Sequence, residues 1–300
     1  MTHQFRGILA LLFVTTVWGT TFPAMKDLTA HFSAVWIIAV RFALAALLLT
    51  PFLLRASARD YRAGALLGVV LFICYVLQIK GLALTSSNRN AFVTGLNVLI
   101  VPLLGLAAGK RPERRIVVAL VLAVAGLFAL CGGSGGAWGL GDTLALLGAC
   151  VFGLYIKLME VATRGADKLM SLTAVQIGTV AVCAVVWLLV AEAPFQGGAR
   201  PDYWPVLGAA LRNHMLNFLY LGVICTAAII SLQTWGQRHS TANEAAVMYA
   251  FEPAAAAFFA YFWLGETMTP AAWAGAALLI SGMIVSQWNT ERPAAALAPE

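Results

Sequence analysis

Charged residues are scarce in this sequence. Only 11% of the 300 residues are Asp, Glu, Lys or Arg, whereas 61% are hydrophobic, and the mean hydropathy is +0.85. An ordinary soluble domain carries about 25% charged residues, and a soluble chain of this length could not cover its surface with so few. The composition therefore predicts an integral membrane protein. It predicts an all-α fold as well, because an open sheet cannot satisfy its backbone hydrogen bonds in lipid.

The residues that most often build metal and catalytic sites are few and dispersed. The chain has 4 histidines and 5 cysteines, and none of them occurs in a CxxC, CxxxH or HExxH motif. The GGSGG run at residues 132–136 lacks the GK[ST] ending of a phosphate-binding loop and is typical of a linker. The sequence therefore predicts no metal site, no cofactor and no enzyme activity.

Long apolar runs fill most of the chain, and a spanning helix needs about 20 such residues. Ten segments fit: residues 7–24, 33–54, 63–83, 89–108, 114–131, 139–160, 169–190, 214–235, 243–264 and 270–288. We expect the first to be retained, since no small-x-small cleavage site of a signal peptide follows it. The short connections leave no room for an extramembrane domain.

Lys and Arg are distributed unevenly among these connections. With a cytoplasmic N-terminus, 13 of them lie inside and 5 outside, and Arg41 lies within a span. Positive residues favour the cytoplasmic side, so both termini are predicted to be cytoplasmic. Basic clusters such as residues 55–62 and 110–115 thus account for the net charge of +6 without a nucleic-acid partner.

The two halves of the chain are similar to each other. Residues 81–97 align with residues 236–252 without a gap, which pairs Asn97 with Glu252. Each half holds five predicted spans, and an odd number makes the second half enter the membrane from the opposite side, as in secondary transporters. The predicted organisation is a first five-helix repeat at 1–131, a glycine-rich linker at 132–138, a second inverted five-helix repeat at 139–290 and a tail at 291–300.

Several motifs in both halves resemble those of one transporter family. They are WGTTFPAMK (18–26), RFALAALLL (41–49), GLNVLIVPLLG (95–105) and TANEAAVMYAFEPAAAAFFAYFWLGE (241–266). Through them the chain resembles the drug/metabolite transporter (DMT) superfamily, specifically its EamA family of ten-helix carriers. Within that family it is most similar to the inner-membrane amino-acid exporters of the YddG type.

The resemblance implies ten transmembrane helices, arranged as two inverted five-helix repeats around a central cavity. The first, third, fourth, sixth, eighth and ninth helices would line the cavity, and the fifth and tenth would pack outside it. Transport would proceed by alternating access in a bacterial cytoplasmic (inner) membrane. The implied function is export of aromatic or neutral amino acids or related metabolites.

Polar and aromatic residues at helical spacing mark a candidate pathway, because polar groups in a span usually face the bundle interior. The candidate pathway residues are Trp18, Thr21, Tyr75, Gln78, Asn90, Thr94, Asn97, Phe152, Tyr155, Gln233, Tyr249 and Glu252. Amides and hydroxyls can bind the charged groups of a zwitterion, while aromatic faces pack on its side chain and attract its cation. The alternative for each amide is a hydrogen bond between helices. For Arg41, whose repeat mate is the neutral Gln176, a structural role is favoured over one in the pathway.

An acidic residue followed by a proline interrupts the ninth predicted span. Pro253 cannot donate a hydrogen bond to the carbonyl of Tyr249, so the helix is expected to bend there. Pro102 is the matching candidate for a kink in the fourth span. Two roles remain open for Glu252, namely proton coupling and holding neighbouring helices together.

The expected partners are a small-molecule substrate and membrane lipids. The sequence is compatible with a monomer and does not fix the oligomeric state, the direction of transport or the energy coupling. Two further hypotheses remain beside amino-acid export. One is a carrier of the same fold for another metabolite or drug, and the other is a non-transporting membrane sensor or assembly factor.

Overall fold

The computed structural model of the chain describes residues 3–107, 114–133, 137–192, 203–249 and 251–287. Within these ranges, all regular elements are helical. They are α1 (His3–Leu28), α2 (Ala34–Leu53), α3 (Ala58–Leu84), α4 (Ser87–Gly95), α5 (Asn97–Ala107), α6 (Arg114–Gly133), α7 (Leu140–Arg164), α8 (Leu169–Ala191), α9 (Tyr203–Asn213), α10 (Met215–Leu219), the π-helical segment η1 (Tyr220–Ala228), α11 (Ile229–Arg238), α12 (Ala242–Tyr249), α13 (Glu252–Leu264) and α14 (Pro270–Gln287).

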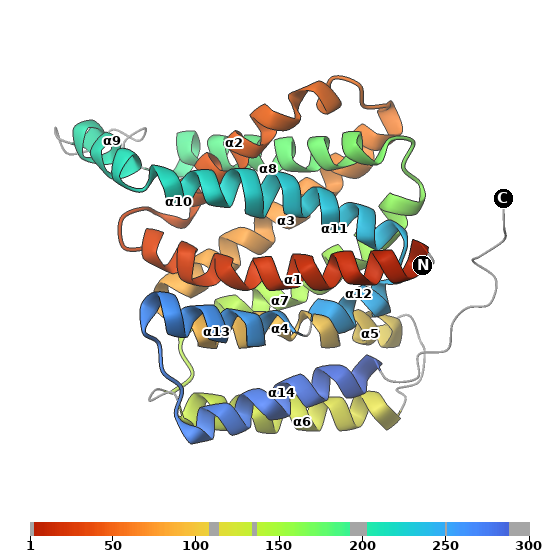
Figure 1. The fold of residues 1–300 in the computed structure, drawn as a ribbon, viewed down its shortest axis with the longest axis vertical. Helices are drawn as coiled ribbons and strands as arrows, with labels where there is room; N and C mark the ends of the chain where they lie inside the picture. Colours follow the sequence, from red (N-terminus) through yellow and green to blue (C-terminus); the bar gives the residue numbers. More distant parts are fainter. Residues whose placement is uncertain (1–2, 108–113, 134–136, 193–202, 250, 288–300) are drawn as a thin grey trace.

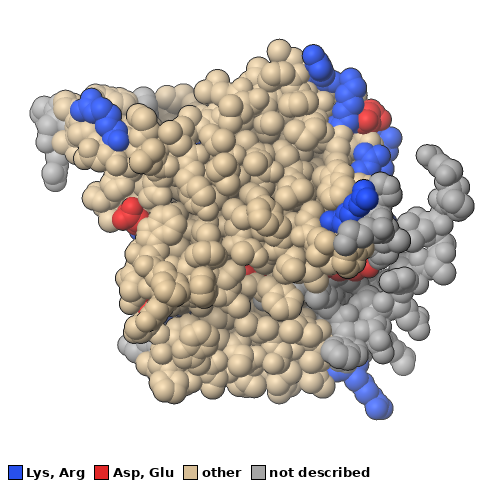
Figure 2. Space-filling model, in the orientation of Figure 1, with Lys and Arg blue, Asp and Glu red and all other residues tan. Residues whose placement is uncertain are grey.

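Six helical runs in the described part of the chain are long and apolar enough to cross a membrane. They comprise α1 from Phe5 onward, α2, α3, α7, α8 and the continuous run Met215–Arg238, which joins α10, η1 and α11. The face shown in Figure 2 is almost free of charged side chains between the two ends of the helices. The fold is therefore that of an all-helical, multi-pass membrane protein.

Two of the remaining predicted spans, 89–108 and 243–264, are interrupted rather than continuous. A single residue, Leu96, separates α4 from α5. In the second half α12 ends at Tyr249, and Phe251 lies in a turn directly before α13. Pro253 lies in the first turn of α13, where a missing N–H breaks no helical hydrogen bond. Pro102 lies within α5, beyond the break at Leu96, and its side chain is outside the described residues.

The two predicted spans not yet placed, 114–131 and 270–288, correspond to α6 and α14, which pack on each other at one edge of the stack of helices in Figure 1. At the opposite edge α2 packs on α8. Between these pairs, α1 contacts α11, α12 and α13, while α7 contacts α3, α4 and α5. The two interrupted helices therefore lie at the centre, because α4 also contacts α13 and α5 contacts α12.

A glycine permits the close contact between α1 and α13. A Cβ atom added to Gly19 would lie 2.6 Å from the Ala255 Cβ and 2.8 Å from two backbone atoms of α13. We expect Gly19→Ala to lower the free energy of unfolding by about 1–3 kcal/mol, because overpacking forces the helices apart. Thermal unfolding in detergent, followed by tryptophan fluorescence, measures the change.

The control for this prediction is Gly208→Ala in α9. A Cβ at Gly208 would meet no atom within 4 Å, and alanine is the better helix former by roughly 0.5–1 kcal/mol. The control is therefore expected to be neutral or stabilising. Equal stability of the two variants would show that the α1–α13 contact tolerates the added methyl group.

Candidate functional site

A cavity lies where the interrupted helices meet α1, α3, α7 and α11. Its lining residues are Trp18, Thr21, Leu71, Tyr75, Gln78, Thr94, Asn97, Phe152, Tyr155, Ile156, Ile230, Gln233, Tyr249 and Glu252. Eleven of the twelve candidate pathway residues are among them. The structure therefore brings together side chains that the sequence spreads over more than two hundred positions.

Asn90 is the candidate that does not line the cavity. Its side chain is fully buried, and its Nδ2 donates to the Gln78 carbonyl at 3.3 Å. This bond ties α4 to α3, so Asn90 serves as a link between helices.

Three apolar lining residues, Leu71, Ile156 and Ile230, were missed by the sequence reasoning, which considered polar and aromatic residues. Helical spacing could have found them. Leu71 lies one turn before Tyr75, and Ile230 lies three residues before Gln233.

Aromatic rings make up much of the cavity wall. The ring centroids of Trp18 and Tyr249 lie 5.7 Å apart, and those of Phe152 lie 6.0 Å from Tyr75 and 6.4 Å from Tyr155. Two phenol oxygens are held by amides from neighbouring helices. Gln176 Nε2 donates to Tyr155 at 2.8 Å, and Gln233 Nε2 donates to Tyr249 at 3.2 Å. These bonds fix the rings at the cavity wall.

Other polar atoms of the wall have no partner among the described residues. They are the indole Nε1 of Trp18, the hydroxyl of Thr94 and the Oδ1 atom of Asn97. Buried polar groups are normally hydrogen-bonded, and a missing partner costs on the order of 1–3 kcal/mol. These three atoms offer hydrogen-bonding positions to a polar ligand or to water in the cavity.

Glu252 is the first residue of α13 and the carboxylate of the cavity wall. It is partly buried. No hydrogen bond or ion pair to its carboxylate is found within the described residues. These residues also contain no group of three or more His, Cys, Asp or Glu side chains that could hold a metal ion.

Arg41 lies behind the cavity wall, 1% exposed. Its guanidinium donates to the Thr226 hydroxyl, and at 3.4 Å to both the Tyr75 phenol and the Cys225 carbonyl. The guanidinium carbon also lies 5.0 Å from the centre of the Tyr75 ring. Thr226 belongs to η1, and its hydroxyl in turn donates to the Leu221 carbonyl, five residues earlier. Arg41 therefore joins α2 to the π-helical segment and supports Tyr75 from behind.

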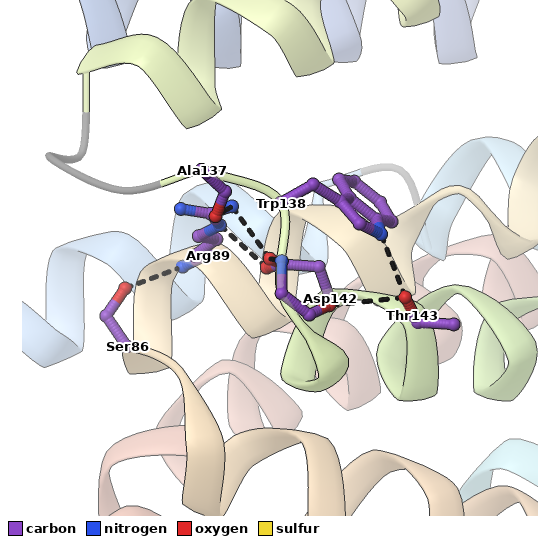
Figure 3. Close-up of polar contacts among 7 residues, drawn as sticks. Ser86, Arg89, Ala137, Trp138, Asp142 and Thr143 are labelled. Carbon is purple, nitrogen blue, oxygen red and sulfur yellow. Dashed lines mark hydrogen bonds and ion pairs between the residues drawn. The ribbon is translucent and has the colours of Figure 1, made fainter.

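A buried ion pair closes the packing between α4 and α7 (Figure 3). Arg89 Nε and Nη2 donate to the two carboxylate oxygens of Asp142 at 2.6 and 2.7 Å. The side chains are 7% and 4% exposed. Arg89 Nη2 also donates to the Ala137 carbonyl at 3.1 Å. The sequence reasoning treated Arg89 only as an outer charge and did not consider Asp142.

Glu266 and Lys26 extend this network at the same end of the bundle. Glu266 accepts hydrogen bonds from the backbone N–H groups of Ser87 and Asn88 at 2.8 and 3.0 Å, so it caps α4. Lys26 Nζ donates to the carbonyls of Leu82 and Thr85 at 2.9 and 2.7 Å. The end of α1, the end of α3 and the start of α4 are thus held together.

The sequence model of the EamA-like transporter family matches residues 5–131 and again residues 139–287. The chain belongs to the EamA-like transporter family. The two matched stretches leave out residues 132–138, the glycine-rich run between the predicted repeats. This EamA-like chain is therefore a multi-pass membrane protein of a transporter family, as its motifs predicted.

Two curated relatives of this transporter come from Archaeoglobus fulgidus, and each is named an uncharacterized transporter. One is 27% identical over 92% of this chain and 84% of its own length. The other is 23% identical over 93% of this chain and 96% of its own length. A solved crystal structure, described only as that of a protein, covers 93% of this chain and 96% of its own with a TM-score of 0.62 at 16% identity. This last match bears on the fold alone.

Proposed function

We propose that this EamA-like transporter exports aromatic or neutral amino acids, or related metabolites, by alternating access. The observation that carries the proposal is the central cavity, whose wall combines five aromatic side chains with unpartnered polar atoms and one carboxylate. Such a wall suits a small solute with an apolar body and a charged head, because the aromatic faces pack on the body and the polar atoms bind the head.

Alternating access in this proposal depends on two inverted five-helix repeats. Matching the five spans of each half in order relates α1 to α7, α3 to the run Met215–Arg238, and α5 to α13. Under it, the contacts of α1 with α11 and α13 become those of α7 with α3 and α5. The contacts α2–α8 and α6–α14 map onto themselves. This exchange of contacts supports a two-fold relation between the repeats, with the cavity near the axis.

The paired helix interruptions also support transport. Leu96 and Phe251 are paired by the alignment, and both lie where a helix is broken beside the cavity. Interrupted helices at membrane depth are tolerated where they line a cavity, and in secondary transporters they form the substrate site.

The orientation in this proposal places both termini in the cytoplasm of a bacterial cell. In Figure 2, Lys and Arg side chains gather at the end of the bundle where the chain begins. This asymmetry supports a cytoplasmic location for that end, because positive residues are retained inside. The Arg89–Asp142 pair and Glu266 then lie at the periplasmic end of the bundle, where their bonds hold α4 in place.

Flux measurements test the proposal. Proteoliposomes that contain the purified chain are expected to take up labelled phenylalanine and alanine faster than protein-free liposomes. If aromatic and small neutral amino acids are not taken up but another metabolite or drug is, the proposed substrate class is wrong and the transport function stands. Absence of any flux, together with a stable partner on purification, would instead indicate a non-transporting membrane protein.

A further inference from the structure

The charges around the cavity are unbalanced. Glu252 supplies a carboxylate, and the lining residues within the described part of the chain include no Lys, Arg or His. A carboxylate removed from water needs a compensating partner. A positively charged group bound beside Glu252 would provide that partner.

The buried cations of the described interior are engaged elsewhere. Arg41 is held by Thr226, Tyr75 and the Cys225 carbonyl on the far side of the cavity wall. Arg89 is paired with Asp142 between α4 and α7. In this arrangement neither guanidinium neutralises Glu252, so its carboxylate is available to a positively charged group of a bound solute.

The surroundings of Glu252 are suited to a cation. Tyr249 lies three residues before it, on the other side of the helix break, and packs on Trp18, with ring centroids 5.7 Å apart. The faces of Trp and Tyr rings attract cations through their quadrupoles. An aromatic pair beside a carboxylate combines two forms of attraction for one positive group.

Hydrogen-bond acceptors complete the site. The two helix breaks touch, since a Cβ added to Gly95 would lie 2.6 Å from Pro253 Cγ, next to Glu252. On the α4–α5 side of this contact, the hydroxyl oxygen of Thr94 and the Oδ1 of Asn97 are buried without a partner among the described residues. An ammonium group has three N–H donors. Glu252, Thr94 and Asn97 offer acceptors from both interrupted helices.

We propose that Glu252, with Trp18, Tyr249, Thr94 and Asn97, forms a binding site for the ammonium group of the transported solute. The substrate class is then primary amines with an apolar or aromatic body, whether or not they carry a carboxylate. This inference rests on the proposed function, because it takes the cavity as the pathway. It excludes solutes of the same body whose nitrogen is acylated, since these carry no positive charge.

Binding of three matched probes tests the site. The purified full-length chain in lipid nanodiscs is titrated with 2-phenylethylamine, phenylalanine and N-acetylphenylalanine, and binding is followed by isothermal titration calorimetry. The first two are expected to bind, and N-acetylphenylalanine about tenfold or more weakly. Equal affinity of all three probes, or no binding of either amine, would overturn the proposal.

Substitutions localise the site. Glu252→Gln keeps the shape of the side chain and is expected to weaken binding of 2-phenylethylamine about tenfold or more. Glu252→Asp keeps the charge and is expected to retain the preference for the amine. The control Glu192→Gln makes the same change at a carboxylate that binds Ser33 at the surface, and is expected to leave the affinity unchanged. Wild-type affinity in Glu252→Gln would overturn the site, and thermal unfolding shows whether each variant is folded.

The two proposals fail in different ways. If the amines bind with the expected preference but no flux is observed, export is wrong and the ammonium site stands. If amino acids are transported but acylation of the nitrogen changes neither binding nor flux, export stands and the ammonium site is wrong.

Discussion

Leu71→Trp is expected to abolish transport while leaving the protein folded. Leu71 is 2% exposed and lines the cavity from α3. The larger indole would occupy space that a solute needs, so uptake of labelled phenylalanine by proteoliposomes should fall to the level of protein-free liposomes. The cost in stability is expected to be smaller, about 1–3 kcal/mol, because part of the indole can extend into the cavity.

Leu66→Trp provides the matched control on the same helix. Leu66 is 54% exposed on the outer surface of the described fold, where a lipid-facing indole meets no packed neighbour. Its transport rate is expected to equal that of the wild type. Wild-type transport by a folded Leu71→Trp variant would show that solutes do not pass through this cavity.

The cavity wall could be predicted from the sequence because its signals are local. Thr94 and Asn97 follow one another at helical spacing, and the alignment of the halves carries this stripe onto Tyr249 and Glu252. A polar residue in an apolar span usually faces the interior of the bundle, because exposing it to lipid is costly. The repeat then predicts the matching residues of the second half, and these line the same cavity.

Contacts between distant residues could not be predicted in this way. Arg89 and Asp142 are 53 positions apart and belong to different predicted repeats, and no spacing rule connects them. Asn90 shows the same limit within a stripe. It shares the helical spacing of Thr94, but its position nearer the start of α4 places it against α3 and away from the cavity.

The helix interruptions lie between these two cases. Pro253 predicted a disturbance because its missing N–H leaves the Tyr249 carbonyl without a helical partner, and α12 ends at that residue. In the first half the helix breaks at Leu96, which precedes Pro102 by more than a turn. There the contact of Gly95 with Pro253 occurs at the break itself. The break at Leu96 thus coincides with a packing contact from the other half of the chain. No local sequence pattern encodes such a contact.

Asp142→Asn is expected to have the largest effect on stability. The substitution leaves the guanidinium of Arg89 buried beside a neutral amide, and breaking a buried ion pair costs about 3–5 kcal/mol. Thermal unfolding in detergent measures the loss. Asp27→Asn is the control, because Asp27 is 44% exposed and lies 3.7 Å from His214. An exposed pair of this kind is expected to contribute about 1 kcal/mol or less.

The double variant Arg89→Leu/Asp142→Leu separates charge from packing. Because it removes both buried charges at once, it is expected to recover most of the stability that Asp142→Asn loses. Recovery would show that the single variant fails through an uncompensated charge. A double variant as unstable as Asp142→Asn would contradict this account. It would mean that the bonds of Arg89 to Asp142 and to the Ala137 carbonyl are themselves needed to hold α4 against α7, and that apolar contacts do not replace them.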